Sequence, residues 1–235
     1  MFKMRLLTVI ILAMLSFVSI PSAFGSFSAG YGDLYGTEVD FLNIYEHTDT
    51  EDHALYNTPT LVGNRQLYFP TAFVSEAGES SDDITSGVLS MTLRATEGYA
   101  IRKVKISEWG SYSLTGEGST ATSAGLSALL TVNGESDSFT AGPYEGPGPL
   151  SGTFNVSGEL DFAGLGITEL DFSLSNELFT TSEDGTTAKI EKALLQNNVE
   201  VEILTAEVPI PGSLLLFGTG SGLFSLAGIR RLRKK

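Results

Sequence analysis

The chain of 235 residues contains no cysteine, which excludes a disulfide framework and any thiolate metal site. Basic side chains are also scarce, since 14 Lys and Arg stand against 28 Asp and Glu, for a formal net charge of −14. This charge argues against nucleic acid as a partner, because phosphate binding needs a basic surface. Hydrophobic residues make up 42% of the chain and charged residues only 18%, which predicts a folded core rather than a disordered protein.

Signatures of catalysis are few as well. The chain has two histidines, His47 and His53, whose spacing does not fit an HExxH motif, and it has no GxSxG nucleophile elbow. We therefore expect a protein that is not an enzyme, with no catalytic residues and no cofactor. Paired carboxylates of a glycoside hydrolase are defined by their separation in space, so a surface glycan hydrolase stays open as an alternative.

Segment 46–53 holds both histidines and four acidic residues, and it is the one candidate for a metal site. Carboxylate oxygens suit Ca²⁺, but the glycine and the spacing of an EF-hand loop are missing. A solvated acidic loop is the favoured interpretation, and Ca²⁺ binding is the alternative.

The N-terminus has the layout of a secretory signal. A basic start precedes the apolar run Leu6–Ile20, and the small residues Ala23 and Gly25 stand three positions and one position before Ser26. The run is short for a membrane span, and a cleavage pattern follows it at once. We predict that residues 1–25 are a signal peptide, which signal peptidase removes before Ser26. An uncleaved anchor or a buried core helix is the competing interpretation.

The C-terminus carries a second segment directed to the membrane. Residues 213–229 hold no charge and would form a helix roughly 25 Å long, short for a bilayer span unless flanking bases snorkel. By the positive-inside rule, the basic tail 230–235 stays cytoplasmic and the acidic middle of the chain lies outside. The bases of this tail are Arg230, Arg231, Arg233, Lys234 and Lys235.

A short proline motif, Val208-Pro209-Ile210-Pro211, precedes this apolar segment and holds the chain extended at the membrane boundary. The proline motif, the glycine-rich apolar helix and the basic tail together resemble the PEP-CTERM sorting signal of exported bacterial proteins. A plain single-span membrane anchor is the competing interpretation. Ile210 replaces the middle glutamate of the usual motif, so the chain is most similar to the apolar-centred Val-Pro-x-Pro variants.

This resemblance implies recognition by an exosortase, a membrane-embedded enzyme similar to cysteine transpeptidases. It also implies a transient stay in the inner membrane, then release or attachment at the cell surface or in the extracellular matrix. Family members occur mainly in Gram-negative bacteria that make extracellular polysaccharide. A role in exopolysaccharide or biofilm is the corresponding functional expectation.

Residues 26–206 are long enough for one domain, and their dominant hydrophobic period is two. Apolar residues alternate with polar ones over 89–95 and 199–203, for example, as in antiparallel strands with one buried face. Asn133-Gly134 is the best local hairpin signal, and the prolines and glycines of 142–149 predict a loop. We expect an all-β domain of nine to eleven strands, an antiparallel β-sandwich that resembles a jelly roll.

Segment 189–196 is ambiguous between a strand and a short helix, and the strand is favoured. The middle of the chain also resembles uncharacterised PEP-CTERM ectodomains, a likeness that implies architecture rather than chemistry. The expected layout is a signal peptide (1–25), a β-sandwich ectodomain (26–206), a processing linker (207–212), a transmembrane helix (213–229) and a basic cytoplasmic tail (230–235).

The functional expectation is a structural or adhesive protein of the cell surface, whose acidic face binds divalent cations that bridge acidic polysaccharide. The alternative is a carbohydrate-binding module that stacks sugar rings on exposed aromatic residues such as Trp109 and Tyr112. Large aromatic side chains most often fill a core, so core packing is the favoured interpretation of both residues.

Overall fold

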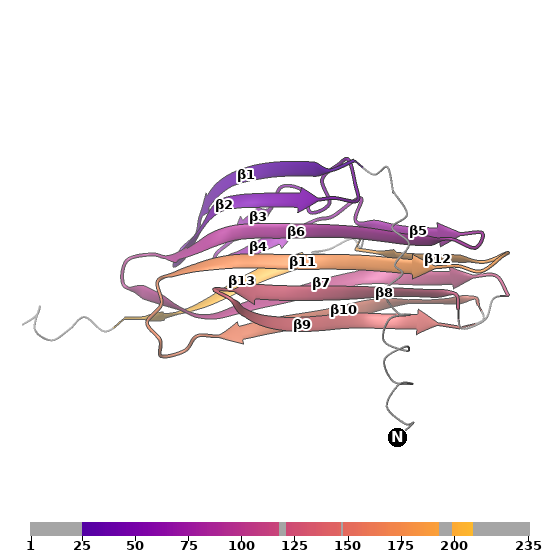
Figure 1. Cartoon of the computed structure of the whole chain (residues 1–235). Coiled ribbons are helices and arrows are strands. Elements are labelled where there is room, and N and C mark those ends of the chain that lie inside the picture. Colours follow the sequence, from indigo (N-terminus) through magenta and orange to yellow (C-terminus); the bar gives the residue numbers. More distant parts are fainter. Residues whose placement is uncertain (1–24, 118–120, 147, 193–198, 209–235) are drawn as a thin grey trace, which may run out of the picture.

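The computed structural model describes residues 25–117, 121–146, 148–192 and 199–208. These residues form thirteen strands in two antiparallel sheets that pack face to face, as Figure 1 shows. The expected all-β sandwich is therefore confirmed. Across the described ranges, no helix has the length and apolar character that a bilayer crossing requires. The predicted transmembrane segment 213–229 and almost all of the predicted signal peptide lie outside the described residues.

The first sheet has six strands, and its central strands β6 and β11 pair along nearly their whole length. β9 lies at one edge of this sheet and β1 at the other. In spatial order the strands are β1 (Phe27–Tyr35), β2 (Val39–Thr48), β6 (Asp82–Ala95), β11 (Glu169–Thr181), β8 (Ser123–Val132) and β9 (Glu135–Glu145).

The second sheet has seven strands and is built around the long strand β7. One edge of β7 pairs with β10, and its other edge pairs with β13 and then with β12. β7 therefore joins two shorter groups of strands into one layer. The strands are β3 (Thr60–Val62), β4 (Arg65–Tyr68), β13 (Val199–Glu207), β7 (Tyr99–Thr115), β12 (Thr187–Glu191) and β5 (Val74–Gly78), with β10 (Leu150–Asp161) beside β7.

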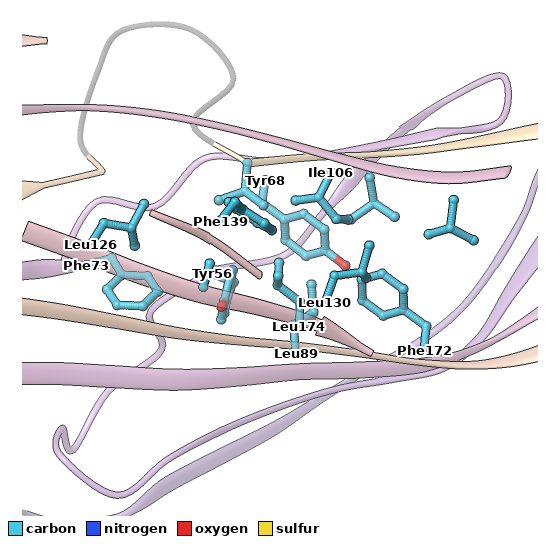
Figure 2. Packing of buried hydrophobic residues seen from close by; sticks show 14 of the residues in the cluster. Tyr56, Tyr68, Phe73, Leu89, Ile106, Leu126, Leu130, Phe139, Phe172 and Leu174 are labelled. Atoms are coloured by element: carbon cyan, nitrogen blue, oxygen red, sulfur yellow. The ribbon is translucent and has the colours of Figure 1, made fainter. Parts of the chain in front are cut away.

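The core lies between the two layers, and the alternation in the sequence accounts for it. Every second residue of a strand points to the same face, so the apolar rows of both sheets meet in the interior. Leu89 on β6 and Ile106 on β7, for instance, are fully buried and belong to one continuous cluster with Leu130 and Leu174 (Figure 2). The alternations noted in the sequence therefore mark the buried faces correctly.

Two local predictions have different outcomes. The hairpin at Asn133-Gly134 is confirmed, because both residues have positive φ, 49° and 85°, and they join β8 to β9. The loop predicted for 142–149 is wrong in part, since β9 continues to Glu145 and β10 begins at Leu150. Pro143 is tolerated because β9 is an edge strand and its pairing with β8 shifts register at this point.

The strand count also differs from the expected nine to eleven. The described residues form thirteen strands, and four of them, β3, β4, β5 and β12, have only three to five residues each. Strands this short do not show a clear period of two in the sequence. The strand favoured for 189–196 is confirmed over Lys189–Glu191, which belongs to β12, whereas 193–198 lies outside the described residues.

Candidate functional site

A carboxylate, an ammonium group and an amide lie together between the two sheets. Glu108 is on β7 of the second sheet, Asn176 is on β11 of the first sheet, and Lys192 directly follows β12. Glu108 and Lys192 are 0% exposed and Asn176 is 1% exposed. Charged residues are almost never buried to this degree unless they are paired, so this cluster is the main candidate site of the described chain.

Glu108 connects the other two side chains, one through each carboxylate oxygen. Lys192 Nζ lies 2.9 Å from Glu108 Oε2, and Asn176 Nδ2 donates to Glu108 Oε1 at 2.7 Å. Asn176 Nδ2 also donates to the Tyr56 hydroxyl at 2.8 Å. Asn176 Oδ1 is buried and makes no hydrogen bond within the described structure. Buried polar atoms without a partner are uncommon, so the amide carbonyl calls for an explanation.

Aromatic rings enclose the cluster. Lys192 Nζ stands 4.6 Å from the centroid of the Phe73 ring and 6.0 Å from that of Tyr56. Tyr56 in turn contacts Phe73 and Tyr68 edge to face, at centroid distances of 5.3 and 5.9 Å. Figure 2 shows these three rings in the packed interior. The cluster is therefore held in an apolar, water-poor environment in which charge interactions are strong.

Burial changes the proton affinities in this environment. Loss of hydration lowers the pKa of the Lys192 ammonium, and the attraction of Glu108 opposes this change only in part. Loss of hydration also raises the pKa of Tyr56, and the charge of Glu108 raises it further. The neutral amine of Lys192 and the neutral phenol of Tyr56 are therefore both favoured relative to the same groups in water.

The local sequence accounts for the position of each group. Gly87 on β6 is the register partner of Asn176, and a Cβ at this glycine would come within 2.8 Å of Leu55 and 3.4 Å of the Tyr56 ring. The missing side chain thus leaves room for the ring that covers the cluster. Lys192 is fixed by its backbone, whose N–H donates to the carbonyl oxygen of Phe73 at 3.0 Å.

A second buried carboxylate, Glu46 on β2, supports the loop that carries Tyr56. It accepts hydrogen bonds from the backbone N–H groups of Leu55 and Tyr56, and from the hydroxyl of Tyr31. The prediction that 46–53 is a solvated acidic loop is wrong for Glu46, which is 0% exposed. The sequence places it in the inward row of β2, two residues after the buried Ile44.

Thr48 at the end of β2 is buried as well, whereas the two histidines of 46–53 pair with acidic residues at the surface. His47 Nε2 lies 3.0 Å from an Asp49 oxygen, and His53 Nδ1 lies 3.1 Å from an Asp52 oxygen, on the protein surface. Among the residues that the structure describes, no three His, Asp or Glu side chains are placed to hold a metal ion together. Nothing in this geometry supports the alternative of a Ca²⁺ site at 46–53.

Trp109 lies outside the core, contrary to the favoured interpretation. It follows the inward-facing Glu108, so its side chain is on the outer face of the second sheet, where it is half-buried. Tyr112 does pack against the core, and its ring stacks on Tyr144 with centroids 3.6 Å apart. The core interpretation is therefore confirmed for Tyr112 and wrong for Trp109.

The same outer face carries a shallow hollow of about 390 Å³, which begins at Ser111, two residues after Trp109 on β7. Its walls are small hydroxyl side chains and one ion pair, in which Lys189 Nζ lies 2.7 Å from a Glu191 oxygen. Ser111 donates to Glu191 at 3.2 Å. The polar residues that line the hollow are Ser111, Ser113, Ser151, Thr153, Lys189 and Glu191.

The structure places only part of the predicted processing residues. Gly25 and Ser26 are exposed directly before β1, while Ala23 lies outside the described residues. Val208 is exposed after β13, and its N–H donates to the carbonyl oxygen of Gly98 at 2.8 Å. The remaining residues of the predicted sorting signal lie outside the described residues: Pro209, Ile210, Pro211, Arg230, Arg231, Arg233, Lys234 and Lys235.

The sequence interpretation missed the Glu108–Lys192–Asn176 cluster, although two signals for it exist. Glu108 continues the inward row that contains Val104 and Ile106, and Asn176 stands in the inward row of β11 beside the buried Leu174. A charged or amide residue in phase with a buried row predicts a buried partner.

Comparisons with known proteins do not identify a family for this chain. No protein-family model matches the chain, and no curated protein matches it. Among solved structures, it is similar to the enzymatically active domain of tailspike protein 4 of bacteriophage CBA120, with 11% identity and a TM-score of 0.25 over 76% of this chain and 19% of that chain. It is also similar to a structure of infectious bursal disease virus, Gx strain, with 10% identity and a TM-score of 0.24 over 80% of this chain and 57% of that chain.

The chain thus spans about a fifth of the tailspike chain and somewhat over half of the viral chain. TM-scores this low carry no argument about fold, activity or ligand.

Proposed function

We propose that this chain is an exported structural or adhesive protein of the bacterial cell surface or extracellular matrix. One observation supports it best: the folded domain fits between the two predicted processing regions. β1 begins at Phe27, one residue after the predicted N-terminal cleavage site at Ser26. β13 ends at Glu207, one residue before the Val208-Pro209-Ile210-Pro211 motif. Removal of both ends would leave every described strand intact.

In this proposal the C-terminal segment is a sorting signal of the PEP-CTERM type. The apolar segment 213–229 holds the exported chain in the inner membrane, with the basic tail in the cytoplasm. An exosortase acts on the extended proline motif, and the sandwich moves to the surface. All 28 acidic residues lie between the two ends, which suits a soluble domain in a hydrated polysaccharide layer and attraction of bridging divalent cations.

Mass spectrometry of the protein recovered from cell-surface material tests this proposal. We expect an N-terminus at Ser26 and a C-terminus upstream of Ser213. Intact peptides from 213–235 in the surface fraction would contradict processing at the proline motif. The same digest of the inner-membrane fraction is the control, because it should contain those peptides from the unprocessed intermediate.

A second candidate function is carbohydrate binding on the outer face of the second sheet. The observation that favours it is the position of Trp109, half-buried on that face and close along β7 to the hydroxyl-lined hollow. A fixed indole ring offers an apolar face to a sugar ring, and the neighbouring hydroxyl and charged groups offer hydrogen bonds to sugar hydroxyls.

Affinity electrophoresis through gels that contain the polysaccharide of the source cell tests this candidate. Trp109→Ala should abolish retardation and leave the melting temperature unchanged, since the ring lies outside the core. Tyr35→Ala is the matched control, because Tyr35 is 70% exposed on β1 of the other sheet. Equal retardation of wild type and Trp109→Ala would rule the site out.

A further inference from the structure

The buried cluster, which has no role in the proposed function, contains the side chains that an amide-forming reaction requires. Lys192 supplies an amine nucleophile, Asn176 supplies a carboxamide electrophile, and Glu108 contacts both through its two oxygens at 2.9 and 2.7 Å. All three side chains are at most 1% exposed, so water does not compete with the amine. Proximity of this kind makes a reaction between two side chains effectively unimolecular.

We propose that Lys192 and Asn176 form an intramolecular isopeptide bond, with Glu108 as the group that transfers protons between them. The proposal is a covalent modification site of the folded chain, and it is independent of where the protein is finally located.

The reaction balances without a further reactant. Lys192 gives a proton to Glu108, and the neutral amine attacks Cγ of Asn176, so that a new C–N bond forms. Glu108 then takes part in moving one proton from Nζ to Nδ2. The bond between Cγ and Nδ2 breaks, and ammonia leaves. The carboxyl proton of Glu108 leaves with the ammonia as ammonium, so the carboxylate is restored. No oxidant or reductant is involved.

The surroundings favour each step. Burial lowers the pKa of Lys192, which raises the share of the nucleophilic amine. The carbonyl oxygen Oδ1 of Asn176 has no hydrogen-bond partner within the described structure. Nδ2, the nitrogen that leaves as ammonia, lies 2.7 Å from Glu108 Oε1, so Glu108 is in reach of both nitrogens between which it moves the proton.

The position of the bond in the fold gives it a mechanical consequence. Asn176 is in the middle of β11, in the first sheet, whereas Lys192 follows β12 of the second sheet. The new amide would therefore link the two layers covalently through the core. In a chain without cysteine, this bond takes the place that a disulfide has in other exported domains.

Intact-mass measurement of the full-length wild-type protein, purified in the folded state and then denatured, tests the proposal. We expect a mass lower by one ammonia, about 17 Da, than the mass calculated for the same termini. A protease digest should contain a branched peptide that joins the segments holding Asn176 and Lys192. A folded protein with its full calculated mass would overturn the proposal.

Two other results would overturn it as well. One is loss of ammonia without the branched peptide, which would show cyclisation of a single amide. The other is loss of water, about 18 Da, with a link between Lys192 and Glu108. The measurement uses the wild-type chain, so it does not depend on whether any variant folds.

Variants identify the roles of the three residues. Lys192→Arg and Glu108→Gln should both keep the full calculated mass, the first because it removes the amine and the second because it removes the proton carrier. Asn176→Asp should lose water instead of ammonia on forming the same link. Ammonia loss that persists in Glu108→Gln at the wild-type rate would contradict the role of Glu108.

Discussion

The Glu108–Lys192 pair makes the sharpest stability prediction, because both side chains are fully buried and 2.9 Å apart. At an effective dielectric constant of about 20, two unit charges at this distance attract each other by about 6 kcal/mol. Desolvation of both groups offsets most of this attraction, so the net contribution of the intact pair is small. Removal of one partner leaves the other buried without its counter-charge, which typically costs about 3–5 kcal/mol.

Three variants isolate this effect: Lys192→Met, Glu108→Gln and the double variant. None of them can form the proposed amide, so differences among them report the cost of leaving one buried charge without its partner and not the loss of the cross-link. We expect Lys192→Met to be less stable than the double variant by about 3 kcal/mol. Glu108→Gln should fall between the two, since the lowered pKa of Lys192 lets the amine become neutral.

Urea unfolding followed by the fluorescence of Trp109, the only tryptophan, provides the measurement. A Lys192→Met variant as stable as the double variant would contradict this prediction, because it would show that an unpaired, buried Glu108 does not destabilise the fold. A double variant less stable than both single variants would contradict it too, by showing that a lone buried Glu108 or Lys192 is less costly than its neutral replacement.

Three further predictions concern the stability of the domain. Gly110→Ala should lower the free energy of unfolding by about 3 kcal/mol or prevent folding, because the added Cβ would lie 2.3 Å from the Glu191 carbonyl oxygen. Urea unfolding measures this loss, and a variant as stable as wild type would contradict the prediction. Gly134→Ala should lower the free energy of unfolding by about 1 kcal/mol in the same assay, because φ is +85° at this hairpin position while no neighbouring atom blocks the methyl group. A loss of stability too small to detect would contradict this prediction. Stability should fall as pH rises above about 10, because burial raises the pKa of Tyr56 and Tyr68 above their unfolded value of 10.0 and only the unfolded chain ionises there. Urea unfolding between about pH 8 and 11 checks this, and Tyr68→Phe should reduce the slope.

The sequence predicts the layers of this fold well because the signal for a half-buried strand is local. Leu89, Leu93 and Ile106 stand at every second position of their strands, and all three are fully buried. The Asn133-Gly134 turn is likewise determined by two adjacent residues, both of which adopt positive φ. Local patterns of this kind need no knowledge of which strands become neighbours.

The buried cluster depends on long-range register, which no local pattern contains. Asn176 and Glu108 are 68 residues apart, and Lys192 and Glu108 are 84 residues apart. Their contact requires the two sheets to pack in one particular alignment. Glu46 illustrates the same difficulty, since it stands in the inward row of β2 while its partners, Tyr31 and the Leu55 backbone, come from other segments. The core prediction for Trp109 fails because the alternation of β7, and not aromatic character, decides which face its side chain takes.

Truncation of the chain after Val208 tests whether the C-terminal segment directs the protein to the cell surface. This truncation spares β13 and the hydrogen bond from Val208 to Gly98, so the domain keeps its described contacts. Wild-type and truncated proteins are produced in the source cell and located by fractionation. We expect wild-type protein to accumulate at the surface with its C-terminus upstream of Ser213. The truncated protein should be exported but absent from the surface fraction. Equal surface amounts of the two proteins would show that the C-terminal segment does not sort the chain.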